Sequence, residues 1–132
     1  MNKISICLSS DNSYVQHLGA TISSVLKSKL DDEYIKFYII DGGISDENKE
    51  KLAVLKNDGC EIIYLKPNKE RFRNCSTENH KYLTIASYYR ILIPELIQEE
   101  RVLYLDCDTI VRKSLKEFFN KDFGDNLLFA SK

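Results

Sequence analysis

The chain has 132 residues, of which 43% are hydrophobic and 30% are charged, a composition typical of one folded domain rather than a disordered chain. Its 19 basic and 20 acidic residues leave a net charge of −1, so we expect no nucleic-acid partner. The apolar runs fall far short of the roughly 20 residues that span a bilayer, and the N-terminus does not resemble a signal peptide.

Strand-like and helix-like patterns alternate along the chain. Apolar runs predict strands over residues 3–10, 34–43, 60–67 and 101–106, with a further strand beginning at 126–132. Apolar residues at helical spacing predict helices over residues 14–29, 45–57, 82–96 and 115–119. Ser45 and Ser114 stand where they could cap two of these helices, and residues 68–81 are polar and irregular.

This alternation predicts an α/β fold: a Rossmann-like, mostly parallel sheet with helices on both faces. Such sheets bind ligands in the crevice beyond the carboxyl ends of their strands. Three of the predicted strands end in acids there: the first before Asp11, the second at Asp41 and the fourth at Asp106 and Asp108. An unfinished sheet edge would also favour pairing between two copies of the chain, so we consider a homo-oligomer.

The cysteines are isolated from one another and form no C-x-x-C pair, which argues against a zinc site or a disulfide framework. They stand at Cys7, Cys60, Cys75 and Cys107. We expect free thiols, in keeping with a reducing cytoplasm. A longer protein that contains this chain could also be peripheral at the inner face of the membrane.

Asp106 and Asp108 follow the oily run that ends the fourth predicted strand. Residues two apart in a continuing strand stand about 6.5–7 Å apart, whereas bonds from one small cation to oxygen are about 2.1 Å long. The chain must therefore turn near Cys107, or one acid must act through water or a ligand hydroxyl. Carboxylates select Mn²⁺ or Mg²⁺, which could clamp a diphosphate. The alternative is that the pair is a solvated acidic loop.

Two other classes of protein, a phosphatase and a phosphoacceptor domain, are consistent with parts of the pattern. In a haloacid-dehalogenase-type phosphatase, Asp106 would be the nucleophile and Asp108 the acid or base, but that motif normally opens a domain. A receiver-type phosphoacceptor domain suits the length, but the third strand ends in Lys66-Pro67 rather than in an acid. A non-enzymatic binding module also remains open.

The run "LYLDCD" resembles the D-x-D motif of the family 8 glycosyltransferases, which have the GT-A fold. The resemblance extends over essentially the whole chain. "SSDNSYVQHLGATISSVLKS" is similar to the family's opening strand and helix, "FYIIDGGIS" to its second strand and turn, and "LTIASYYRILIPEL" to the helix before the D-x-D.

This resemblance implies a UDP-linked sugar donor and a manganese ion. Asp106 and Asp108 then correspond to the metal-binding acids, the first also near the ribose. Asp11 corresponds to the acid that reads the uracil edge, Tyr14 to the aromatic residue that stacks on the base, and Arg90 to the arginine near the sugar and phosphate. The resemblance also places Ser9, Ser13 and Cys107 at the nucleotide, although some members carry Asn at the position of Ser13.

Each of these residues also has an ordinary structural interpretation. Asp11 could simply cap the helix that follows it. Tyr14 could be a packing residue, because the chain has 8 tyrosines. Arg90 could pair with a surface acid. The glycines Gly42 and Gly43 are expected to form a turn.

Family members are roughly twice as long as this chain. Their second half supplies a further histidine ligand, a lysine near the diphosphate and the groups that place the acceptor. We therefore expect residues 1–132 to be the N-terminal, nucleotide-sugar-binding part of such an enzyme, in a truncated form or from a broken gene. The parent would move a sugar from a nucleotide to a glycan or lipid-linked acceptor with retention. This part alone should bind donor weakly and transfer sugar slowly or not at all.

Overall fold

The protein is described by a computed structural model that covers residues 2–66, 93–122 and 124, leaving out the side chain of residue 95. Its described strands are β1 (Asn2–Ser10), β2 (Glu33–Asp41), β3 (Cys60–Leu65) and β4 (Leu103–Tyr104). Its described helices are α1 (Val15–Ser28), α2 (Asp46–Ala53), α4 (Ile93–Leu96) and α5 (Lys116–Phe119), with a single 3₁₀ turn at Asn12–Tyr14. Arg90, the irregular segment 68–81, most of the predicted helix 82–96 and the predicted strand 126–132 lie outside the described residues.

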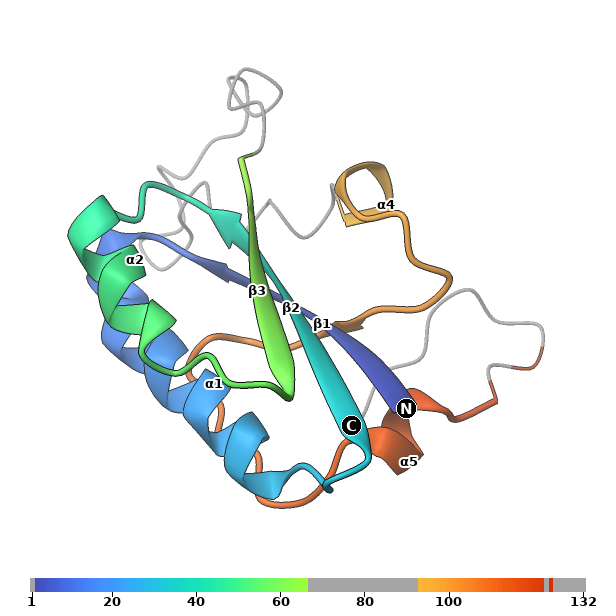
Figure 1. The fold of residues 1–132 in the computed structure, drawn as a ribbon. Coiled ribbons are helices and arrows are strands. Elements are labelled where there is room, and N and C mark those ends of the chain that lie inside the picture. Colours follow the sequence, from blue (N-terminus) through green and yellow to red (C-terminus); the bar gives the residue numbers. More distant parts are fainter. Residues whose placement is uncertain (1, 67–92, 123, 125–132) are drawn as a thin grey trace.

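The four described strands form one parallel sheet in the order β3-β2-β1-β4 (Figure 1). β1 pairs with β2 over its full length, from Asn2 opposite Glu33 to Ser10 opposite Asp41. All residues of β1 from Ile4 to Ser10 are buried. This burial explains the continuous apolar run, since a parallel strand covered on both faces has no solvent side. The predicted α/β fold with a parallel sheet is confirmed.

Alternate side chains of the strands pack into two clusters on opposite faces of the sheet. The larger cluster joins Ile4, Ile6 and Leu8 of β1 to Leu18 and Ile22 of α1. Leu52 of α2 joins the same cluster, so α1 and α2 cover this face together (Figure 1).

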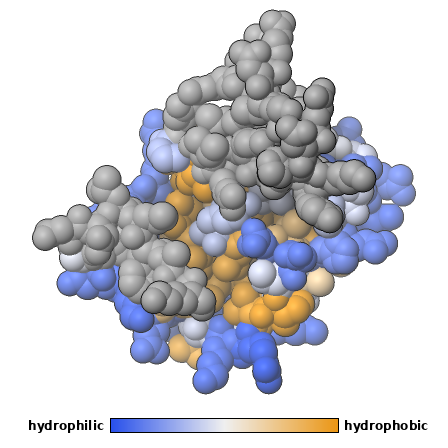
Figure 2. Space-filling view, turned by 180° about the vertical axis from the view of Figure 1, so that it is seen from behind, coloured by the Kyte–Doolittle hydropathy of each residue, from blue (hydrophilic) through white to orange (hydrophobic). Residues whose placement is uncertain are grey.

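The smaller cluster lies on the other face of the sheet. It joins Cys7, Tyr38 and Ile40 to Ile97, with Ile93 of α4 packed against it. Tyr38 donates a hydrogen bond of 2.6 Å to Glu99 Oε1, which anchors the chain after α4 to the sheet. Seen from the side opposite to Figure 1, apolar surface is visible between hydrophilic residues (Figure 2).

The helix predicted over residues 45–57 is correct at its start and too long at its end. Ser45 caps it as predicted, since its hydroxyl accepts the N–H of Asn48 at 3.2 Å. The regular helix stops at Ala53, where the N–H groups of Leu55 and Lys56 bond three residues back instead of four. This tightened last turn is a common way to end a helix.

The fourth strand is shorter than the predicted range 101–106. Only Leu103 and Tyr104 pair with β1, opposite Ile6 and Cys7. The N–H of Leu105 still bonds the carbonyl of Cys7 at 3.0 Å, and the chain then turns away from the sheet. The apolar run is only partly buried: Leu105 packs against the larger cluster, and Val102 and Tyr104 pack against the smaller one. Hydrophobicity alone does not fix how long a strand stays paired.

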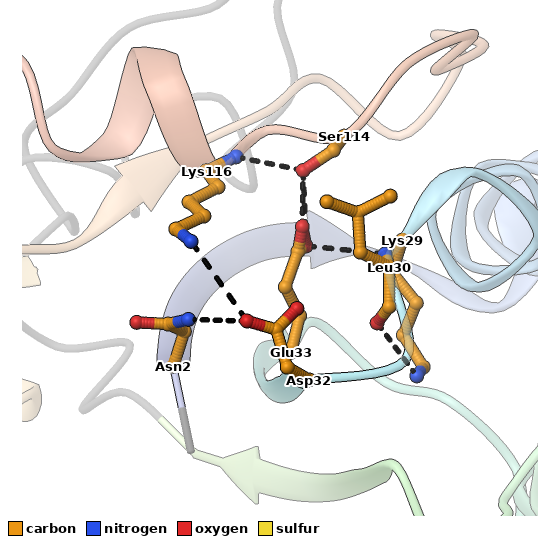
Figure 3. A network of polar contacts seen from close by, with 7 residues as sticks. All are labelled: Asn2, Lys29, Leu30, Asp32, Glu33, Ser114 and Lys116. Atoms are coloured by element: carbon orange, nitrogen blue, oxygen red, sulfur yellow. Dashed lines mark hydrogen bonds and ion pairs between the residues drawn. The ribbon is translucent and has the colours of Figure 1, made fainter.

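A polar network closes the amino ends of β1 and β2 (Figure 3). Glu33, only 1% exposed, accepts hydrogen bonds from the Ser114 hydroxyl with both carboxylate oxygens and lies 3.4 Å from the N–H of Leu30. The neighbouring Asp32 accepts a hydrogen bond of 2.7 Å from Asn2. The same Ser114 oxygen accepts the N–H of Lys116 at 3.2 Å, although Leu115 rather than Ser114 is the capping residue of α5. The network therefore ties the chain that enters α5 to the start of β2.

Replacing Ser114 with Ala should lower the free energy of unfolding by about 1–3 kcal/mol, because a buried carboxylate loses its hydroxyl donor. Urea unfolding followed by circular dichroism would measure this change. The matched control is Lys113→Ala at the exposed preceding residue, which should stay within about 0.5 kcal/mol of the unmodified chain. Equal stability of the two variants would contradict the role given to Ser114.

Candidate functional site

The carboxyl ends of β2, β1 and β4 meet at one edge of the sheet, since the three strands are parallel neighbours. The chain after β1 begins with Asp11, and the chain after β4 reaches Asp106 and Asp108. Because β1 lies between the other two strands, its loop lies between theirs. This edge is where open parallel sheets bind ligands.

Asp106 and Asp108 are both exposed and lie in a turn rather than in an extended strand. The turn includes Cys107 and Asp108, and the Thr109 hydroxyl closes it with a hydrogen bond of 2.9 Å to the carbonyl of Asp106. The expected turn near Cys107 is therefore confirmed. The two carboxylates are not held to the spacing that a continuing strand would impose.

The Cys107 thiol lies in an environment that raises its pKa. Burial raises its pKa most, and the negative charges of Asp108, Asp106 and Asp11 raise it further. Asp11 therefore lies within electrostatic range of the same thiol as the Asp106–Asp108 pair. The thiol packs against the larger core cluster, and its raised pKa keeps it protonated at neutral pH.

The loop after β1 is organised by Asp11. Its Oδ1 accepts the N–H of Ser13 at 2.9 Å, the Ser13 hydroxyl at 2.7 Å and the N–H of Tyr14 at 3.2 Å. The capping interpretation of Asp11 is thus confirmed, and its role at a nucleotide stays a prediction. Ser9 is buried near the end of β1, and Ser13 is exposed.

Tyr14 is 47% exposed, so it is not an ordinary core residue. Its ring centroid lies 5.6 Å from that of His17, with the planes tilted by 45°. Tyr14 belongs to neither of the two hydrophobic clusters. A partly exposed ring beside Asp11 is suited to stacking on a planar ligand.

Asp41, the acid at the end of β2, serves a different purpose. Its Oδ1 accepts the N–H groups of Gly43 and Ile44 at 2.9 and 2.7 Å. The Lys49 ammonium lies 2.7 Å from Oδ2, an ion pair whose angles fall outside hydrogen-bond geometry. Burial acts to raise the pKa of Asp41, but Lys49 and the two N–H groups outweigh it and hold that pKa below its usual range. Gly43 has a φ of 119°, which confirms the predicted glycine turn.

Sequence patterns missed two groups of polar residues that shape this edge. Asn12 Oδ1 accepts the N–H of Ser45 at 2.9 Å and the Asn48 amide at 2.8 Å, so it joins the loop after β1 to the start of α2. Thr21 and Ser24 of α1 bond the chain that follows β4. Thr21, Ser24 and Ser28 lie at helical spacing on one face of α1, which was the available signal, although the spacing does not identify their partners.

The exposed carboxylates of Asp106 and Asp108 match the hard oxygen donors that Mn²⁺ and Mg²⁺ prefer. Within residues 2–66 and 93–122, no group of three or more His, Cys, Asp or Glu side chains could hold a metal ion. Asp106 and Asp108 therefore belong to no cluster of three such side chains among the described residues. None of the helices in this part of the chain combines the length and apolarity that a membrane crossing needs.

Residues 5–132 match the glycosyl transferase family 8 profile. General stress protein A of Bacillus subtilis is 35% identical over 119 residues, which are 86% of this chain and 41% of that protein. A putative glycosyltransferase of Haemophilus influenzae is 31% identical over 129 residues, covering 96% of this chain and 38% of its own. The chain therefore spans about two fifths of the length of these curated relatives.

The fold is shared with the galactosyltransferase LgtC, solved in complex with donor and acceptor sugar analogues. The two superimpose with a TM-score of 0.82 at 32% identity, over 93% of this chain and 44% of LgtC. This match confirms the GT-A type of fold. It favours neither the phosphatase nor the receiver alternative.

Replacing Lys49 with Met should destabilise the chain by about 1–3 kcal/mol at pH 7, because the buried Asp41 carboxylate loses its cation. A carboxyl whose pKa is lowered by folding contributes stability above its unfolded pKa of about 4, and this stability is lost as the pH falls through the folded value. The difference between the two proteins should therefore shrink below about pH 4. Urea unfolding at several pH values would measure it.

The control for this experiment is Lys51→Met, two residues along α2. Lys51 is exposed and lies 3.7 Å from the equally exposed Glu47. Such pairs contribute little, so the change should stay within about 0.5 kcal/mol. A Lys49→Met deficit that is the same at pH 7 and pH 3 would contradict the role of the Asp41 charge.

Proposed function

The chain belongs to glycosyl transferase family 8, and from this premise we propose that residues 1–132 form the N-terminal, nucleotide-sugar-binding part of a GT-A glycosyltransferase. The donor is a UDP-sugar, and the parent enzyme transfers its sugar to an acceptor with retention. The observation that carries the proposal is that β1 and β4 are parallel neighbours, so Asp11, Asp106 and Asp108 follow their strands at the same edge of the sheet.

Asp106 and Asp108 would hold a divalent cation, Mn²⁺ or Mg²⁺. When bound, such an ion supplies positive charge next to the diphosphate that leaves with the nucleotide. The two acids suit this role because they are exposed and, among the described residues, neither takes part in an ion pair. Asp41, which is buried and paired with Lys49, is a structural acid by the same test.

The base would be held by the loop after β1. Asp11 would contact the edge of the uracil and Tyr14 its face, with Ser9, Ser13 and the backbone of Cys107 nearby. Asp11 already orients this loop through Oδ1, so the acid and the ring are presented together. Arg90, which the resemblance places at the sugar and phosphate, completes the proposed donor contacts from outside the described residues.

A second candidate is a nucleotide-binding unit that does not transfer sugar. The observation in its favour is that the chain spans 44% of LgtC and that its described residues contain no group of three or more side chains able to hold a metal ion. The two proposals share the same donor site. They differ in turnover by the chain alone, which we expect to be slow or absent.

Isothermal titration of the 132-residue chain with UDP, with and without MnCl₂, tests the site directly. We expect binding that requires Mn²⁺ and that weakens about 10-fold or more in Asp106→Asn or Asp108→Asn, since each loses a metal ligand. Asp58→Asn, an exposed acid before β3 at the other edge of the sheet, is the matched control. UDP binding that ignores Mn²⁺ would contradict the metal site, and rapid sugar transfer by this chain would contradict its being one part of a larger site.

Replacing Tyr14 with Ala should weaken binding of UDP, because base stacking on an aromatic ring contributes about 1–3 kcal/mol. Tyr14→Phe keeps the ring and should bind like the unmodified chain. Both variants should keep the same requirement for Mn²⁺, because Tyr14 is not proposed to bind the ion. Equal UDP affinity of the Ala and Phe variants would show that the ring does not stack on the base.

A further inference from the structure

Helix α1 presents a row of hydroxyls to the chain that follows the acidic turn. The row consists of Thr21, Ser24 and Ser28. Ser24 and Ser28 follow Thr21 by three and seven residues, so the three side chains share one face of the helix. Their partners lie between 83 and 88 residues away in the sequence, in the segment from Cys107 to Val111.

Thr21 is fully buried, and its hydroxyl lies 2.7 Å from the carbonyl of Thr109 and 3.0 Å from that of Cys107. A threonine hydroxyl has one hydrogen, so the two carbonyls share it. These carbonyls stand on either side of Asp108. Thr21 therefore fixes the backbone both before and after one of the two proposed metal ligands.

The other two hydroxyls hold the chain one step further on. Ser24 accepts the N–H of Val111 at 2.9 Å while it donates to the carbonyl of Thr21 at 2.7 Å. Ser28 donates to the carbonyl of Val111 at 2.8 Å. Both backbone groups of Val111 are thus satisfied by α1, much as a neighbouring strand would satisfy them.

The hydroxyls of α1 provide hydrogen-bond partners for backbone groups that lie beyond the end of β4. Pairing with β1 ends at Tyr104 and Leu105, so the backbone groups beyond that point leave the sheet. Buried backbone groups without partners are costly, and a helix normally has no free backbone groups to offer on its side. Side-chain hydroxyls are the groups through which α1 can supply those partners.

We infer that Thr21 is a positioning residue for the proposed cation site: its hydroxyl holds the Asp106–Asp108 turn in the conformation that binds the ion. The inference rests on the proposed function. The turn closes through a second hydroxyl, since Thr109 bonds the carbonyl of Asp106 at 2.9 Å. Loss of the Thr21 hydroxyl frees two carbonyls of this turn without removing either carboxylate.

The test measures how much Mn²⁺ is needed for half-maximal UDP binding, by isothermal titration of the 132-residue chain. Thr21→Val keeps the shape and removes the hydroxyl. We expect it to need about 10-fold more Mn²⁺, the effect typical of losing a group that orients a metal ligand. At saturating Mn²⁺ its UDP affinity should return to that of the unmodified chain, and Thr21→Ser should behave like the unmodified chain throughout.

Ser114→Ala is the matched control, because it also removes a hydroxyl from a polar network but lies at the opposite end of the sheet. It should leave the Mn²⁺ requirement unchanged even though it lowers stability. A folded Thr21→Val chain with an unchanged Mn²⁺ requirement would overturn the inference. If Thr21→Val does not fold, Thr21→Ala decides, since it also removes the hydroxyl and an unchanged Mn²⁺ requirement there would overturn the inference equally.

The two proposals fail in different ways. If UDP binding by the unmodified chain does not depend on Mn²⁺, the proposed metal site itself is wrong. If that binding depends on Mn²⁺ but the hydroxyl variants do not change the requirement, only the positioning role of Thr21 is wrong.

Discussion

The pairing of β1 with its two neighbours is the interaction on which the rest of the structure depends. β1 bonds β2 along nine residue pairs and β4 on its other side, and it is buried on both faces. Because all three strands run in parallel, the loops after them emerge at one edge. The acids that follow β1 and β4 are distant in the sequence, and this pairing places them at the same edge of the sheet.

The acidic residues at the ends of the strands fall into two groups, one bonded within the fold and one exposed. At the amino ends, Glu33 and Asp32 are bonded by Ser114 and Asn2, and they connect distant segments of the chain. At the carboxyl ends, Asp106 and Asp108 are exposed. Carboxylates that repel one another destabilise the free protein, and a cation relieves that repulsion. The exposed Asp106 and Asp108 are therefore suited to binding a cation, whereas the bonded Glu33 and Asp32 stabilise the fold.

The sequence predicted those parts of the fold that depend on local patterns. Continuous apolar runs gave β1, β2 and β3, and the spacing of Leu18 and Ile22 gave α1. The length of β4 was wrong, because strand length depends on where the partner strand stops bonding rather than on hydrophobicity. The hydroxyl row of α1 was missed for a related reason. A threonine or serine on a helix is locally unremarkable, and its partner near Cys107 is identified only once the chain has folded.

Asp11 shows why a structural role and a ligand role are compatible in one residue. A carboxylate has two oxygens and about four acceptor sites, so three donors on Oδ1 do not exhaust it. The contacts from Ser13 and Tyr14 instead restrict its rotamer and fix the start of the 3₁₀ turn. Restricting a side chain before a ligand arrives removes part of the entropy cost of binding. The capping contacts of Asp11 would therefore strengthen a contact with a base, and the same argument applies to the hydroxyls that hold the turn at Asp106 and Asp108.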